Sequence, residues 1–319
     1  MTQASPSVLT IGIHIVDILG RPVEAVPDGQ GIALLDEIRM TVAGTAAGTA
    51  IDMARLGLNV TTIGAIGDDE LGDWLTHKMS IEGVDTSGLA TIDGVPTSAT
   101  MLPIRPNGER PALHVKGANA LFSIDHVDWN LIEHADYVHF GGTCLLDSID
   151  GEPTGEIMRR AQAAGAITSL DMLGMPDADF DALFRPVLPH LDYFLPNEDD
   201  VLMVSGQSNQ ADATEWLHDH GVGATVITLG ADGAAYSGDG ESEIRVPAYD
   251  VDVVDTTGCG DAFSAGFIAG LVEGLDPLEA VAIGIASGSI VATGLGSDAG
   301  ITDRAGLDRF MRDTPRRSG

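Results

Sequence analysis

A glycine-rich run between two aspartates holds the residues of this sequence best placed to do chemistry. Asp255-Thr-Thr-Gly-Cys-Gly-Asp261 follows an apolar stretch of extended type (248–254) and opens an apolar helix (262–271). Gly258 and Gly260 permit backbone angles at which successive N–H groups converge, and the start of the helix adds the positive end of its dipole. Together these groups predict an anion site that suits a phosphoryl group.

Asp261 closes that run and would stand beside the bound anion. A carboxylate gains nothing from a neighbouring phosphate, because two negative charges repel. A carboxylate that takes a proton from a hydroxyl group, next to donors that hold transferring phosphoryl oxygens, is chemically useful. We therefore predict that Asp261 is a base and that the backbone of Gly258, Cys259 and Gly260 holds the anion. From the residues alone a structural alternative stays open, in which Asp261 caps the helix and the glycines form a tight turn.

The elements that must position this run alternate along the chain. Short apolar runs of β type are followed by helical runs that end near a glycine. This order predicts an α/β fold, with a mostly parallel central sheet between two layers of helices. We treat residues 1–319 as a single domain that ends in a closing helix and a tail (302–319). The predicted strands are 8–11, 60–66, 137–140, 166–170, 193–195 and 225–229, and the predicted helices include 45–56, 71–81, 156–164 and 211–219.

Two inserts, at about 13–40 and 96–116, break this alternation. They hold alternating apolar and polar residues and turn formers but no helical period, and Asn107-Gly108 between two strand-like runs is a hairpin signal. We predict that both inserts together form a small β-sheet appendage. The alternative is a pair of ordinary long loops.

The charge of the chain limits its partners. Its 319 residues carry 48 acidic and 16 basic side chains, a formal net charge of −32. Such a surface repels nucleic acids and anionic lipids, so we expect neither as a partner. The self-repulsion of the fold is screened at high salt, where the Debye length falls to about 3 Å at about 1 M. We therefore expect a halophilic host; an unusually acidic mesophilic protein is the alternative.

Cysteine usage and hydropathy point to the cell interior. Cys144 and Cys259 lie 115 positions apart, which allows neither a CxxC pair nor a disulfide framework. The first seven residues lack the basic and apolar parts of a secretory signal. The longest apolar tract, 281–295, is shorter than the ~20 residues that a membrane span needs. We expect a cytoplasmic protein without a membrane partner.

The run 255–261 resembles the DTxGAGD motif of the ribokinase/PfkB family of ATP-dependent sugar and nucleoside kinases. Cys259 stands where the family usually has alanine, a change that a small hydrophobic residue should make tolerable. Further segments in family order are similar to its GxxGDDxxG, GAN and NxxE motifs and to its nucleotide-binding turn, namely 64–72, 117–119, 197–200 and 228–233. The resemblance implies a ribokinase-like three-layer sandwich in which the β appendage is a lid. No P-loop competes, because neither lysine of the chain follows a glycine.

The resemblance also implies roles for individual residues. Asp261 would be the base and the amides of Gly258 to Asp261 the anion hole. Asn197 and Asp200, which replaces the family's glutamate, would organise Mg²⁺ and its waters. ATP would bind along Thr228, Gly230 and Gly233. Some family members bind K⁺ beside the anion hole, which here implies a K⁺ site at Asp255 and Thr257.

On the substrate side the resemblance implies four residues. Asp17 occupies the family's early aspartate position, and two carboxylate oxygens can accept from adjacent sugar hydroxyls; the alternative is a solvated turn residue. Gly44 matches the family's GGxxxN segment, but Gly48 stands where an asparagine that contacts sugar is usual. Asn119 is the fourth expected contact. The departure at Gly48 should alter the choice of substrate.

These observations predict an ATP- and Mg²⁺-dependent kinase that phosphorylates a hydroxymethyl group of a small sugar or sugar acid, as ribokinases, fructokinases and 2-keto-3-deoxygluconate kinases do. The alternatives are a nucleoside kinase, which would need apolar stacking in a lid that is poor in aromatic residues, and a catalytically silent sugar- or nucleotide-binding regulator. By analogy with relatives we also expect a homodimer through the lid, since unpaired sheet edges invite partners.

Overall fold

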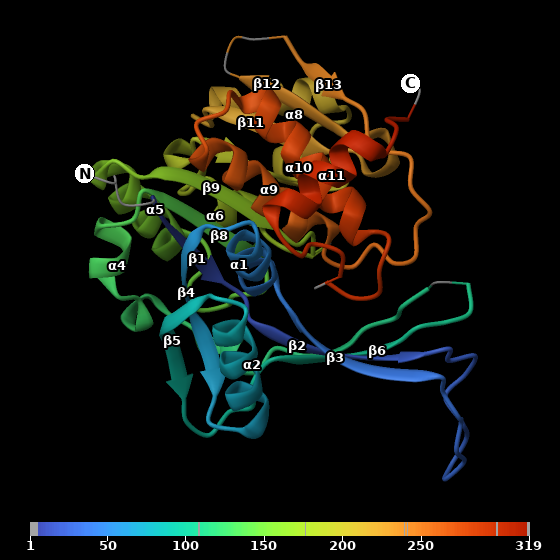
Figure 1. Cartoon of the computed structure of the whole chain (residues 1–319). Coiled ribbons are helices and arrows are strands. Elements are labelled where there is room, and N and C mark those ends of the chain that lie inside the picture. Colours follow the sequence, from blue (N-terminus) through green and yellow to red (C-terminus); the bar gives the residue numbers. More distant parts are fainter. Residues whose placement is uncertain are drawn as a thin grey trace.

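The computed structural model describes residues 6–107, 109–175, 177–238, 240, 242–297 and 299–317. Within them, nine strands form one large sheet in the order β13-β12-β11-β10-β9-β8-β1-β4-β5 (Figure 1). The strands from β11 to β5 are parallel, and β12 and β13 add an antiparallel edge. Their bounds are β1 Ser7–Gly12, β4 Asn59–Gly67, β5 Asp85–Ile92, β8 Tyr137–Thr143, β9 Ile167–Met172, β10 Tyr193–Phe194, β11 Ala224–Thr228, β12 Ala234–Gly238 and β13 Ile244–Val246.

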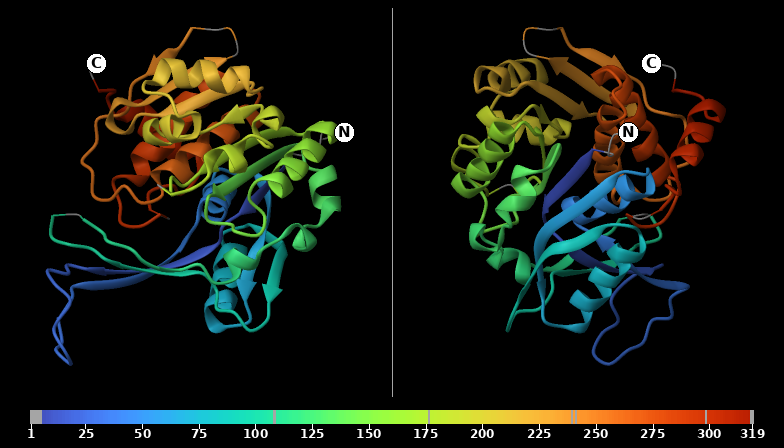
Figure 2. Two further views of the ribbon diagram at one scale, coloured as in Figure 1. Left: turned by 180° about the vertical axis from the view of Figure 1, so that it is seen from behind. Right: turned by 60° about the vertical axis from the view of Figure 1, so that its left-hand side comes forward.

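Helices cover both faces of this sheet (Figures 1 and 2). A separate apolar core lies between each face and its layer of helices. One face holds α1 (Thr45–Arg55), α2 (Glu70–Ile81), α9 (Cys259–Val272), α10 (Pro277–Val291) and α11 (Arg304–Asp313). The other face holds α3 (Ala118–Leu121), α4 (Trp129–Glu133), α5 (Glu152–Ala164), α6 (Phe180–Phe184), α7 (Glu198–Ser205) and α8 (Gln210–Asp219). Because both faces are covered, the central strands β1 and β8 carry no exposed residue, as expected of a doubly packed parallel sheet. The predicted three-layer α/β sandwich is confirmed.

The two inserts form a second, smaller sheet that extends away from the body (Figure 2). Within the described residues it has four strands in the order β3-β2-β6-β7, namely β3 Glu37–Ala43, β2 Ile15–Arg21, β6 Ala99–Pro103 and β7 Leu113–Val115. β2 pairs with β3 and β6 with β7 in antiparallel fashion, while β2 and β6 are parallel. The predicted small sheet is therefore present, with β3 running three residues beyond position 40. Gly108 of the predicted hairpin turn lies outside the described residues.

The chain departs from the prediction just before the glycine-rich run. The expected extended stretch 248–254 is not a strand; apart from one bridge between Tyr249 and Arg316, it is irregular. Val253 and Val254 are 59% and 52% exposed, so this apolar stretch is not paired into a buried sheet. The helix that follows begins at Cys259, three residues earlier than predicted. No helix in the described part of the chain combines the length and apolarity needed to cross a membrane.

Candidate active site

The glycine-rich run forms a tight turn into helix α9. Gly258 is the residue that precedes the helix, and its φ of 76° lies in the left-handed region that favours glycine. A Cβ atom there would lie 2.6 Å from the Cα of Ser297, so the close approach also excludes a side chain. The first amides of an α-helix have no partner within the helix. The amide of Cys259 donates to the carbonyl oxygen of Thr256 at 3.4 Å, so the amides of Gly258, Gly260 and Asp261 are the ones that this turn leaves for a ligand.

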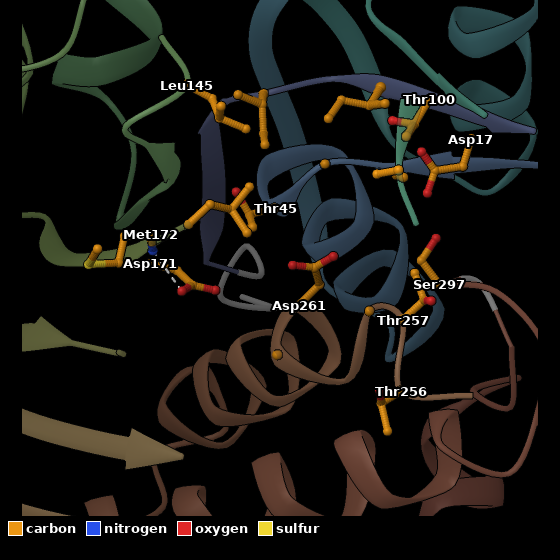
Figure 3. A pocket seen from close by; sticks show the side chains of 18 of the residues that line it. Asp17, Thr45, Thr100, Leu145, Asp171, Met172, Thr256, Thr257, Asp261 and Ser297 are labelled. Atoms are coloured by element: carbon orange, nitrogen blue, oxygen red, sulfur yellow. Dashed lines mark hydrogen bonds between the residues drawn. The ribbon is translucent and has the colours of Figure 1, made fainter. Parts of the chain in front are cut away.

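Asp261 projects from the first turn of α9 into a cavity (Figure 3). Gly258 precedes the helix and no side chain caps it, so the alternative of a capping aspartate is wrong. No described residue gives the carboxylate of Asp261 a hydrogen bond. Burial and the nearby charge of Asp17 raise the pKa of Asp261 to about 7. A half-buried carboxylate that has no hydrogen-bond partner and is only half ionised near neutral pH has the properties of a general base.

The cavity that receives Asp261 has a volume of about 550 Å³. It lies between the start of α9, the start of α1, the carboxyl ends of the large sheet and the small sheet (Figure 3). This place, at the carboxyl edge of a parallel sheet, is where α/β folds bind ligands. Its polar lining includes Asp17, Thr45, Thr100, Arg110, His114, Asp171, Asn197, Asp200, Thr256, Thr257, Asp261 and Ser297.

Asp17 lies in the middle of β2 and is 6% exposed, so it is not a solvated turn residue. Burial raises its pKa to about 6, against the opposing effects of a hydrogen bond from Thr100 and the charge of Arg110. In β6, Thr100 stands opposite Asp17, and its hydroxyl lies 3.1 Å from Nδ1 of His114 in β7. Three strands of the small sheet thus present hydroxyl-binding groups to the cavity.

Two other expected substrate residues, Gly44 and Gly48, lie at the start of helix α1 rather than in the small sheet. Gly44 precedes α1 at a φ of 98° and lines the cavity; a Cβ atom there would lie 2.4 Å from the carbonyl oxygen of Ile13. Gly48 is one turn further along α1, where a Cβ atom would lie 2.9 Å from Oδ2 of Asp261. Its missing side chain therefore makes room for the carboxylate of Asp261. In this chain the departure from the family asparagine concerns Asp261 directly.

Asn119 is buried but does not line the cavity. Its Nδ2 donates to the carbonyl oxygen of His14 at 3.0 Å, and its Oδ1 accepts from the amide of His14 at 3.3 Å. Both ends of the amide are thus used to fix the chain between β1 and β2. The structure assigns Asn119 this positioning contact, and substrate contact by Asn119 stays a prediction.

Another cavity, of about 270 Å³, continues from the first and shares Thr228, Thr256 and Gly260 with it. It holds the predicted nucleotide residues Thr228, Gly230 and Gly233, together with apolar residues of α9 and α10. Among the described residues that line it there is no acidic side chain, in a chain of net charge −32. An apolar cavity without carboxylates, open toward the anion hole, suits the base of a nucleotide.

Part of this second cavity comes from segments that the sequence does not bring together. The tail after α11 returns to the irregular stretch before the glycine-rich run, where the amide of Arg317 donates to the carbonyl oxygen of Ala248 at 2.8 Å. The guanidinium of Arg316 lies 4.0 Å from the centre of the Tyr249 ring. Tyr249 and Arg317 both line the cavity. No motif spacing could indicate a contact across more than sixty residues.

Asn197 and Asp200 begin helix α7 as a reciprocal cap, and both line the first cavity. Oδ1 of Asn197 accepts from the amide of Asp200 at 2.9 Å, and burial raises the pKa of Asp200 to about 6. Within the described residues no group of three or more acidic, histidine or cysteine side chains could hold a metal. Mg²⁺ in phosphate-transferring sites keeps several waters and takes one or two carboxylates beside the phosphates. One carboxylate and one amide oxygen beside the cavity fit that mode of binding.

Asp171 is a buried carboxylate of the cavity that the motifs did not reveal. It is the last residue but one of strand β9. Its Oδ1 accepts from the amide of Met172 at 2.7 Å, and the hydroxyl of Ser264 lies 3.4 Å from its Oδ2. Burial and the charge of Asp261 raise the pKa of Asp171 well above its ordinary value. Its position directly after an apolar β run is the signal that could have found it, because the carboxyl ends of parallel strands meet at one edge.

Asp255 is fully engaged with the protein. Its Oδ1 accepts from the amide and hydroxyl of Thr257 at 3.0 and 2.8 Å, and its Oδ2 accepts from the amide of Gly296 at 2.9 Å. A guanidinium nitrogen of Arg110 lies 2.6 Å from Oδ1. Burial raises the pKa of Asp255, but these hydrogen bonds and the charge of Arg110 outweigh it and hold the pKa below its ordinary value.

The segment Leu295 to Ser297 joins the small sheet to the anion turn. Arg39 of β3 donates to the carbonyl oxygen of Leu295 at 2.7 Å, and Ser297 donates to that of Val42 at 2.7 Å. The same segment gives Asp255 its amide hydrogen bond from Gly296 and packs Ser297 against Gly258. The segment 295–297 thus contacts both strand β3 of the small sheet and the glycine-rich turn.

Comparison with known proteins agrees with this geometry. Residues 5–304 match the pfkB family carbohydrate kinase. The ribokinase of Haemophilus influenzae is 28% identical over 273 residues, covering 84% of this chain and 86% of the relative. The ATP-dependent ribose-1-phosphate kinase of Halopiger xanaduensis is 29% identical over 271 residues, covering 85% and 86%. The crystal structure of a ribokinase from Thermotoga maritima superposes with a TM-score of 0.82 at 25% identity, covering 96% of this chain and 99% of that one. The match along most of its length shows that the chain belongs to the pfkB family of carbohydrate kinases.

Proposed function

We propose that this enzyme transfers the γ-phosphoryl group of ATP to a hydroxymethyl group of a small sugar or sugar acid. The observation that carries the proposal is Asp261, a half-buried carboxylate without a hydrogen-bond partner among the described residues, directed into the first cavity beside the glycine turn. The ribokinase and ribose-1-phosphate kinase relatives support a sugar as the acceptor.

In this mechanism Asp261 accepts the proton of the substrate hydroxyl as its oxygen approaches the phosphorus atom. The amides at Gly258 to Asp261 donate to the phosphoryl oxygens, where charge develops during transfer. Asn197 and Asp200 would hold Mg²⁺ through oxygen atoms and water; when bound, the ion supplies charge neutralisation at the phosphates. Thr228, Gly230 and Gly233 would line the side of the nucleotide.

On the acceptor side, Asp17, Thr100 and His114 suit a polyol, since they offer acceptors and donors to adjacent hydroxyls. Among the described residues that line the first cavity there is no phenylalanine, tyrosine or tryptophan. A nucleoside would leave its base without a stacking partner there, so we favour a sugar. The complete set of Gly258, Gly260 and Asp261 favours an enzyme over a silent regulator.

We further propose that the small sheet acts as a lid and as the contact between two copies of the chain. The side chains of β2 alternate, so that Asp17 faces the cavity and its neighbour Ile18 faces away. On that outer face Ile18 stands opposite Met40 and Met101, and Met101 stands opposite Leu113. Met101 and Leu113 are 58% and 59% exposed. An exposed apolar face with free strand edges at β3 and β7 suits pairing with a second copy.

The proposed reaction is tested by measuring ADP release from ATP with a panel of acceptors at high KCl. The panel holds ribose, fructose, 2-keto-3-deoxygluconate, ribose 1-phosphate and nucleosides, each with Mg²⁺ and with EDTA. We expect release that depends on both a sugar and Mg²⁺. Release with nucleosides alone would favour a nucleoside kinase, and no stimulated release across the panel would favour a regulator.

A further inference from the structure

The guanidinium of Arg110, in the proposed lid, contacts two residues just before the proposed anion turn. Arg110 follows β6 in the second insert, and its side chain is 30% exposed. One guanidinium nitrogen lies 2.6 Å from Oδ1 of Asp255, and the other donates to Oγ1 of Thr256 at 2.9 Å. Arg110 and His114 are the basic side chains among the described residues that line the first cavity, against four aspartates. Arg110 therefore places a positive charge in a cavity whose other charged side chains are mostly negative.

The same contacts leave no room for K⁺ at the carboxylate of Asp255. Three donors occupy Oδ1 and one occupies Oδ2. The nearby carbonyl oxygen of Ala292 already accepts from the amides of Val254 and Asp255. A second cation beside this carboxylate would also be repelled by the guanidinium. The residues present do not fit the K⁺ site that the family resemblance implies.

We propose that Arg110 is the resident cation of this site and that phosphoryl transfer in this enzyme needs no monovalent metal ion. The inference rests on the proposed kinase function. Arg110 acts as a positioning residue: it neutralises Asp255 and fixes Thr256, and these residues set the turn that ends at Gly258. The charges that face it are Asp17 from β2 and Asp255 from the turn, so removal of the guanidinium takes its positive charge from both carboxylates.

The test compares the wild type with Arg110→Met, Arg110→Lys and a matched control, Arg105→Met. Arg105 precedes the same hairpin and pairs with Glu109 on the surface, away from the cavity. Sugar-dependent ADP release is measured in KCl and in tetramethylammonium chloride of equal ionic strength. We expect the wild type and Arg105→Met to differ by less than about twofold between the two salts. Arg110→Met should be slower by about tenfold or more without K⁺ and should recover in part with K⁺; Arg110→Lys should keep its independence of K⁺.

The thermal unfolding midpoint gives a second readout that does not need activity. K⁺ should stabilise Arg110→Met more than it stabilises Arg105→Met, because the emptied position beside Asp255 can then hold the ion. The inference is overturned if the wild type loses about tenfold or more in rate without K⁺, or if Arg110→Met keeps the wild-type rate in tetramethylammonium chloride. If no acceptor stimulates the wild type, the proposed function fails, and an equal K⁺ effect on the two methionine variants would then overturn the inference independently.

Discussion

The carboxylate of Asp261, the proposed base, lies in the first cavity beside the glycine turn. Because α1 carries a glycine at position 48, the carboxylate reaches the cavity without a side chain in its way. Partial loss of solvent around it and the charge of Asp17 raise its pKa and its basicity together. The motif around it was predictable because its residues are contiguous. Asp171 and Arg110 were not assigned roles, because only the folded chain brings them to the same cavity.

Replacing Asp261 by asparagine removes the proton acceptor but keeps the shape of the side chain. We expect kcat to fall by about 10² to 10⁴, with little change in the KM for the acceptor, because the hydroxyl still binds. Steady-state kinetics of sugar-dependent ADP release measures both constants. Asp219→Asn, at the exposed end of α8, is the control and should keep wild-type constants. Unaltered turnover in Asp261→Asn would exclude the proposed base.

The raised pKa of Asp261 predicts opposite effects of pH on activity and on stability. Activity should rise with pH through about 7, because the base acts when ionised. Stability should fall over the range between the ordinary aspartate pKa and about 7, because the folded state binds this proton more tightly than the unfolded state does. Asp261→Asn should therefore be more stable than the wild type at pH 8 and similar to it near pH 4. Thermal unfolding at both pH values checks this; a less stable variant at pH 8 would contradict it.

At the scale of the elements, the sequence predicted the helices that end at glycine and the parallel strands other than β5 closely, since both signals are local. It did not predict the irregular stretch 248–254, because strand pairing depends on a partner, and the partner here is only the bridge to Arg316. The sequence also did not predict the contact of α1 with α9, because the two helices lie far apart along the chain. Gly48 lies on that contact, where a helix-interior glycine otherwise costs stability.

Gly48→Ala should separate stability from activity. Its Cβ atom would lie 2.9 Å from Oδ2 of Asp261, the mobile end of a side chain, so the carboxylate can turn aside at little cost to folding. The substitution should leave the unfolding free energy unchanged or raise it by up to about 1 kcal/mol through helix propensity. The rate should nevertheless fall by about tenfold or more, because the base is misdirected. A stable Gly48→Ala variant with the wild-type kcat would show that catalysis does not depend on the space that Gly48 leaves for Asp261.

The outer face of the small sheet predicts the oligomeric state. Light scattering coupled to size-exclusion chromatography should give twice the chain mass for the wild type. Replacing both Met101 and Leu113 by lysine should yield monomers, because charged side chains on that face cannot be buried without partners. Ile81→Lys, which changes an exposed apolar residue at the end of α2, should remain dimeric. A monomeric wild type, or a dimeric double variant, would exclude this interface.

At the scale of the whole molecule, 48 acidic side chains meet 16 basic ones, and many of the arginines are already paired with a carboxylate on their own helix or hairpin. The excess negative charge is therefore spread over the surface without local compensation. The second cavity, where we propose that the nucleotide binds, is the exception, since no described carboxylate lines it. A polyanionic ligand meets less repulsion there than elsewhere on the molecule.

Salt should therefore stabilise this fold. The unfolding midpoint should rise steadily as KCl is increased from about 0.1 M to about 3 M, because screening weakens the repulsion among surface carboxylates. The effect should be largest at the low end of this range, where the Debye length changes most. Differential scanning calorimetry measures it, with an equally concentrated neutral osmolyte as the control. A midpoint independent of KCl would indicate an acidic protein that has no need of salt.

The joint formed by Leu295 to Ser297 has a thermodynamic consequence. Because this segment is hydrogen-bonded both to β3 of the small sheet and to Asp255 of the glycine-rich run, a shift of the proposed lid would also shift the proposed phosphate turn. Binding of the acceptor would then raise the affinity for the nucleotide, and linkage requires the nucleotide to raise the affinity for the acceptor by the same factor. The dissociation constant of each ligand would therefore depend on whether the other is bound. Hydrolysis of the nucleotide in the absence of acceptor would be suppressed.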